Sequence, residues 1–271
     1  MNDIVNAQAL GRLGPSETRL AAITARPKIV AVVCVVGLTA LGWGACGLMP
    51  TDSARTWTDV LCRPLLGHSL GLEAMLLLAM WLPMTLAMML PSAAPMILTY
   101  AEIADAAARQ GERVASPLVL TAGYLAVWLG VALAMTPLQV VLMSVIPHAP
   151  PQGPVLLAAA SLFAAGLYQF SRLKQACLSL CQRPFRFFFV NWTDRPRGVF
   201  ALGLRQGLYC LGCCWALMLV MFAVGIMNVV WMAILAAVMT IEKLTTTARF
   251  SGAIGAVLIA MSAALVLSEL Q

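Results

Sequence analysis

Residues 207–243 read GLYCLGCCWALMLVMFAVGIMNVVWMAILAAVMTIEK, and this stretch decides the fold. It predicts two apolar helices joined by a tight connection at residues 225–228, too short for a loop, so the helices form a hairpin. Cys210, Cys213 and Cys214 open the first helix at i, i+3 and i+4, a spacing that turns all three thiols towards one side. Three thiols at the start of an apolar helix are the main clue to function.

The composition places the chain in a membrane. Of its 271 residues 61% are hydrophobic and only 10% are charged, and the mean hydropathy is +0.89. A soluble domain carries about 25% charged residues, so we expect an integral membrane protein whose main partner is the lipid bilayer. The net charge of +6 does not indicate nucleic-acid binding, because Lys and Arg in such proteins mark the cytoplasmic loops.

The apolar runs predict an all-α polytopic bundle. A spanning helix needs roughly 20 apolar residues, which favours seven spans, with six as the alternative because one candidate is short. Residues 1–27 then form a cytoplasmic N-terminal segment and residues 28–271 a single transmembrane domain. The candidate spans cover residues 29–49, 73–97, 118–145, 155–171, 204–225, 228–245 and 249–268.

The basic residues predict the orientation. With the N-terminus inside and the C-terminus outside, only Arg55 and Arg63 of the 17 Lys and Arg fall in outer segments. Cytoplasmic loops of membrane proteins carry an excess of Lys and Arg. We therefore expect an N-in, C-out topology.

The second span contains a methionine ladder. Met80, Met84 and Met88 recur at i, i+4 and i+8, which places their thioethers on one helix face, and Met89 flanks them. Prolines in the same stretch remove backbone donors and should bend the helix. Either the ladder supplies soft ligands or its flexible side chains fill irregular space beside the bends.

The predicted helix directions bring several features to one depth. Cys177 and Cys181 follow the fourth span at i and i+4, on the cytoplasmic side where the Met ladder ends and the three-cysteine helix begins. Glu242 ends the sixth span at the same depth, and an ionisable residue there is a functional candidate. The neighbouring Lys243 should extend to the membrane surface, and Tyr124 in the third span should serve packing.

Clustered thiolate and thioether ligands favour Cu(I), because soft ligands select soft cations. Structural zinc prefers four ligands on short turns, and iron–sulfur clusters take four cysteines at more loop-like spacings. The competing interpretation is that the cysteines are small buried hydrophobic residues. The candidate metal ligands are Cys177, Cys181, Cys210, Cys213, Cys214, Met84, Met88, Met89 and Glu242.

The sequence gives little sign of an enzyme. The two histidines, His68 and His148, both fall on the predicted outer side, and no Ser/His/Asp set, phosphate loop or paired carboxylates lie within the bundle. Disulfide exchange ranks last, because the only C-x-x-C spacing, Cys210 to Cys213, lies in an apolar helix without a βαβ pattern.

Residues 72–244 resemble a bacterial family of predicted metal-binding integral membrane proteins, the domain of unknown function DUF2182. The resemblance rests on three blocks. They are Trp81, Met84, Ala87, Met88, Met89, Pro91 and Pro95; Gly166, Tyr168, Gln169, Lys174, Cys177, Cys181 and Pro184; and Gly207, Cys210, Gly212, Cys213, Cys214, Trp215, Met218, Gly225, Met227, Asn228, Trp231, Met232, Glu242 and Lys243.

The resemblance implies a multi-pass protein of the bacterial inner membrane that binds metal, with copper the expected ion. Leu180 and Gln206 stand where that family often has histidine, so we expect either weak metal binding or binding through sulfur alone. We predict a copper-handling protein that holds or passes Cu(I), with a copper enzyme or another membrane subunit as possible partner. The alternative is an assembly or accessory subunit of a membrane complex without bound metal, since small-residue helices suit close helix contacts.

Overall fold

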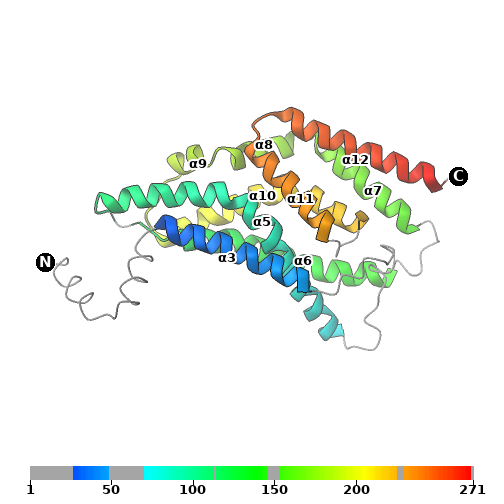
Figure 1. Cartoon of the computed structure of the whole chain (residues 1–271), viewed down its shortest axis with the longest axis horizontal. Coiled ribbons are helices and arrows are strands. Elements are labelled where there is room, and N and C mark those ends of the chain that lie inside the picture. The colour runs from blue at the N-terminus through cyan, green and yellow to red at the C-terminus, as the bar shows by residue number, and fades with distance from the viewer. Residues whose placement is uncertain (1–26, 49–69, 113, 146–152, 225–228, 270–271) are drawn as a thin grey trace.

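The computed structural model describes residues 27–48, 70–112, 114–145, 153–224 and 229–269. Within these ranges every regular element is a helix (Figure 1), which confirms the predicted all-α bundle. The predicted N-terminal segment lies almost wholly outside them. The helices are α3 (Pro27–Leu48), α5 (Leu70–Arg109), α6 (Pro117–Val145), α7 (Gly153–Tyr168), α8 (Arg172–Gln182), α9 (Pro184–Val190), α10 (Pro196–Val224), α11 (Val229–Leu244) and α12 (Ala248–Glu269).

Five of the described helices are long and apolar enough to cross a membrane, and these are α3, α5, α6, α10 and α12. α7 and α8 meet at a bend of 65° and count as a sixth span if they are taken together. α11 has 16 residues, about 24 Å of helix, which is short for a hydrocarbon core of about 30 Å. By length and composition the count is therefore five or six, so the alternative of six fits and the favoured seven exceeds it.

α5 is much longer than the span predicted at residues 73–97. Its 40 residues measure about 60 Å along the axis, twice the thickness of the hydrocarbon core. Pro83, Pro91 and Pro95 lie inside it, and Figure 1 shows the helix changing direction along its length, as prolines that remove backbone donors predict. The continuation to Arg109 is rich in alanine and charge, and α5 is longer than one crossing requires.

α10 forms the centre of the bundle, in contact with α6, α7, α8 and α11, while α3 packs on α5 and α12 on α7. Glycines allow the closest approach. A Cβ atom at Gly123 of α6 would collide with the carbonyl oxygen of Phe200, and one at Gly203 of α10 with that of Leu120. Small residues at a crossing let two backbones approach in this way. Tyr124 follows Gly123 in the sequence. The crossing therefore fixes the position of Tyr124 along the bundle axis relative to the cysteines of α10.

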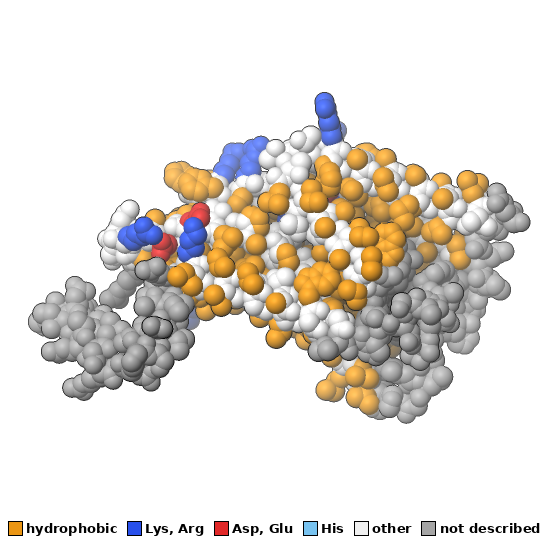
Figure 2. Space-filling model, in the orientation of Figure 1, with side chains coloured by type: hydrophobic (Ala, Val, Ile, Leu, Met, Phe, Trp, Pro, Cys, Tyr) orange, Lys and Arg blue, Asp and Glu red, His pale blue; other side chains and the backbone are white. Residues whose placement is uncertain are grey.

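Successive long helices reverse direction, so segments that are distant in sequence meet at one end of the bundle (Figure 1). The end of α11 and the start of α10 lie there, beside α8 and α9. The described surface over the middle of the bundle is mostly hydrophobic, and on the face in Figure 2 the charged side chains gather at one end and along one edge. Exposed side chains such as Val33, Leu133 and Val257 are consistent with contact to lipid.

Candidate metal centre

The three cysteines of α10 lie together in the interior. Cys210, Cys213 and Cys214 are each 1% exposed. The Cys213 thiol lies 3.2 Å from the carbonyl oxygen of Cys210 and 3.3 Å from the sulfur of Cys214. The i, i+3, i+4 spacing therefore gathers the thiols as predicted, in an environment closed to bulk water.

The two cysteines of α8 approach the same place. The break after α7 turns α8 across α10, and the Ser171 hydroxyl caps α8 by accepting a hydrogen bond from the Lys174 backbone N–H at 3.1 Å. A Cβ atom at Gly212 would lie 2.6 Å from the sulfur of Cys177, so that sulfur lies against the backbone between the α10 cysteines. Cys181 is close enough to Cys213 for their thiols to interact.

We refer to Cys177, Cys181, Cys210, Cys213 and Cys214 as the five-cysteine cluster. The two sequence blocks converge as the predicted helix directions required. Within the described residues, however, no group of three or more His, Cys, Asp or Glu side chains has the arrangement of a metal site. The Cys213 thiol is close enough to those of Cys181, Cys210 and Cys214 to interact with each, so the cluster offers pairs of neighbouring sulfurs.

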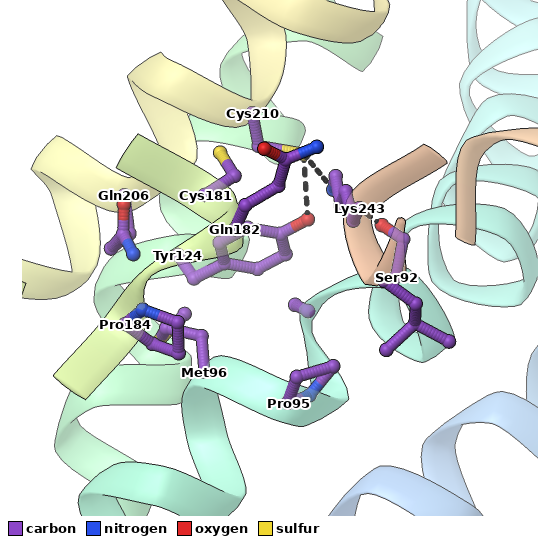
Figure 3. Close-up of a pocket in the computed structure, with 12 residues that line it drawn as sticks. Ser92, Pro95, Met96, Tyr124, Cys181, Gln182, Pro184, Gln206, Cys210 and Lys243 are labelled. Carbon is purple, nitrogen blue, oxygen red and sulfur yellow. Dashed lines mark hydrogen bonds between the residues drawn. The ribbon is translucent and has the colours of Figure 1, made fainter. Parts of the chain in front are cut away.

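A cavity of about 180 Å³ reaches the cluster between α5, α6, α8, α10 and α11 (Figure 3). We call this cavity the thiol pocket. Its only cysteines among the described residues are Cys181 and Cys210, one from each block. It is lined by Ser92, Ala93, Pro95, Met96, Tyr124, Cys181, Gln182, Pro184, Gln206, Cys210, Lys243 and Leu244. The pocket thus presents two thiols from distant parts of the sequence to the same space.

Lys243 points into this pocket and not towards the membrane surface. Its side chain is buried, and its Nζ lies 2.9 Å from the sulfur of Cys210 and 2.7 Å from the hydroxyl of Ser92 (Figure 3). The prediction that Lys243 extends to the membrane surface is wrong, because the side chain finds acceptors inside the bundle. No local pattern indicates this contact, since Cys210 and Ser92 lie far from Lys243 along the chain.

Tyr124 also contacts the cluster, although the sequence indicated only a packing role. Its hydroxyl lies 3.1 Å from the sulfur of Cys210 and donates a hydrogen bond to the backbone oxygen of Met89 at 3.0 Å. Cys210 is therefore held between a phenol and an ammonium group. Because the phenol proton is donated to Met89, the donor directed at the Cys210 sulfur is the Lys243 ammonium.

Glu242, a predicted ligand, lies in a separate polar network. Its carboxylate is 2.7 Å from the Nζ of Lys174 and accepts a hydrogen bond from Ser251 at 2.6 Å. Lys174 also donates to the side chain of Gln169, and the Gln182 side chain donates to the Glu242 backbone oxygen at 2.9 Å. This network ties α8 to α11 and α12. Glu242 does not line the thiol pocket.

The predicted methionine ligands lie in the core beside the pocket. Met84, Met88 and Met89 are at most 2% exposed, and none of them lines the thiol pocket. Met96 does, two helical turns beyond Met89. The sequence analysis did not single out Met96, although continuing the helical period beyond Met89 would have reached it.

These features define a class, a polytopic helical membrane protein with a cluster of free cysteines, three of them buried and two partly buried. Within that class the chain belongs to the PpoB2 family, described as a copper chaperone, which it matches over residues 78–266. The match includes both cysteine blocks and confirms that the chain belongs to a copper-related family, as the resemblance implied. No curated protein and no solved structure matches the chain significantly.

Proposed function

We propose that this protein handles Cu(I) within the membrane, binding it through the five-cysteine cluster and passing it to a copper-requiring partner. The observation that carries the proposal is the convergence of α8 and α10. The two cysteine blocks are distant in sequence but lie together, the α10 cysteines buried and the α8 cysteines partly buried. One cysteine of each block lines the thiol pocket. Soft thiolate ligands select Cu(I) over hard cations, and membership of a copper chaperone family supports copper as the metal.

The Met ladder and Met96 suit transfer along α5. Thioethers bind Cu(I) as soft neutral ligands, and passage needs sites that are strong enough to accept the ion and weak enough to release it. Met84, Met88 and Met89 would supply such steps through the bundle, with Met96 at the pocket. We propose a binding and delivery role in a bacterial inner membrane and no catalysis.

Metal content tests this function directly. The full chain is purified without oxygen in detergent from cells grown with copper, beside a variant with serine at all five cluster cysteines. We expect about one or more copper per chain, lost in the variant, by elemental mass spectrometry. The matched control replaces Cys34 and Cys46 of α3, two free cysteines that do not line the thiol pocket, and it should keep its copper.

Two results would contradict the proposal. Copper retained in the five-serine variant would show that the cysteines do not hold it. Copper missing from the unaltered protein, together with a stoichiometric protein partner, would support the metal-free accessory subunit instead.

A further inference from the structure

The buried charged side chains of the described residues add up to one net positive charge. Among the described residues the buried charged side chains are Lys174, Lys243 and Glu242. Lys174 and Glu242 form an ion pair at 2.7 Å, so their charges cancel. A buried charge without a partner is strongly unfavourable. Lys243 therefore needs an anion, and within the described part of the chain it contacts no carboxylate.

The group that faces Lys243 is the proposed copper ligand. Its Nζ lies 2.9 Å from the sulfur of Cys210, and its other contact, Ser92, is a neutral hydroxyl. Both contacts are in the thiol pocket, where Cys181 provides a second sulfur. The positive charge of Lys243 thus lies in the pocket whose two sulfurs would bind the metal ion.

We propose that Lys243 is the counter-ion of a Cu(I) ion held by two thiolates in the thiol pocket, and that its charge selects a monovalent ion. The inference rests on the proposed function and adds the basis of its specificity. Each thiol that binds releases its proton, so one Cu(I) ion and two thiolates carry one negative charge. The Lys243 ammonium cancels that charge without leaving the protein interior.

A divalent ion fits the same pocket worse. Zn(II) with two thiolates is neutral, and the charge of Lys243 then stays unpaired in a buried place. A third thiolate would restore neutrality. Cys213 lies next to Cys181, but among the described cysteines only Cys181 and Cys210 line the pocket. Zn(II) also binds thiolate ligands readily. Charge balance therefore disfavours Zn(II) in this pocket where ligand type alone would not.

The test compares Lys243→Met with Lys243→Arg in the full-length protein in detergent. Cu(I) affinity is measured without oxygen against a chromogenic Cu(I) chelator, with Ag(I) as a redox-inert monovalent probe and Zn(II) as the divalent one. We expect K243M to weaken Cu(I) and Ag(I) binding by about 10–100-fold, the usual effect of losing a group that supports metal ligands. Zn(II) binding should not weaken, and K243R should retain most of the Cu(I) affinity.

A second pair of variants changes the charge while Lys243 stays in place. Ser92→Asp puts a carboxylate next to Nζ, where the Ser92 oxygen now lies at 2.7 Å. Ser92→Asn is the size-matched neutral control. If the lysine acts through its charge, S92D should lower Cu(I) and Ag(I) affinity well below that of S92N. This comparison holds even if K243M fails to fold.

The outcomes separate the two proposals. An unaltered protein that binds no Cu(I) overturns the proposed function, and this inference with it. An unaltered protein that binds Cu(I), with folded K243M binding it equally well, overturns the role of Lys243 alone. Equal Cu(I) affinities of S92D and S92N would do the same, as would equal losses for Cu(I) and Zn(II) in K243M.

Discussion

At the scale of single residues, Glu242 is a buried carboxylate near the end of α11, 2% exposed. An intramembrane carboxylate is a functional candidate by default, yet here it is paired with Lys174 and hydrogen-bonded by Ser251. Removing one partner of a buried ion pair costs about 3–5 kcal/mol, whereas replacing both partners by apolar groups is often neutral. If Glu242 has a structural role, its mutation should lower stability. If it is a metal ligand, its mutation should remove copper.

We expect Glu242→Gln to lower the thermal stability of the detergent-solubilised protein sharply, because Lys174 keeps its charge without a carboxylate. The double variant Glu242→Gln, Lys174→Met should recover much of that loss. Thermal unfolding measures both variants, and copper per chain is measured on the same samples. If E242Q unfolds at the normal temperature but loses its copper, Glu242 is a ligand and the pairing is incidental.

At the level of elements, the packing of α6 against α10 determines whether Tyr124 reaches Cys210. Gly123 and Gly203 allow this contact, and even a methyl group at Gly203 would meet the backbone of α6. Forcing extra volume into a packed interface costs about 1–3 kcal/mol. An exposed helical glycine behaves in the opposite way, because alanine is the better helix former.

Gly203→Ala should therefore lower the unfolding temperature, by an amount that corresponds to about 1–3 kcal/mol. The control is Gly130→Ala on α6, where a Cβ atom meets nothing within 4 Å, and it should be neutral or slightly stabilising. Both variants are compared by thermal unfolding in the same detergent. Equal stability of the two would show that the helices do not cross at these glycines.

Sequence reasoning succeeded where the information is local. Apolar runs predicted the helices, and i, i+3, i+4 spacing gathered Cys210 with its two neighbours. It failed where contacts depend on how one helix is rotated against another, as with Lys243, which turned inwards to Cys210. Tyr124 was missed for the same reason, because a tyrosine in an apolar helix has no local pattern that separates packing from contact with a distant thiol.

At the scale of the molecule, the path of the chain bears on the number of crossings. Within the described residues, length and composition give five or six spans, since α7 and α11 have 16 residues each. Yet α3, α5, α6, α7, α10, α11 and α12 alternate in direction, and the start of α3 and the end of α12 lie at opposite ends of the bundle (Figure 1). If α7 and α11 both cross, the termini face opposite sides of the membrane. Short helices can cross where the bilayer thins locally.

Topology reporters at the two termini decide this point. We expect green fluorescent protein to fluoresce at the N-terminus and not at the C-terminus, and alkaline phosphatase to be active only at the C-terminus. The physical reason is the bias of the basic residues, which places all but Arg55 and Arg63 of the 17 Lys and Arg on one side. Termini that report the same side would mean an even number of crossings. Either α7 or α11 would then turn back within the membrane, and the thiol pocket beside α11 would open to a different compartment.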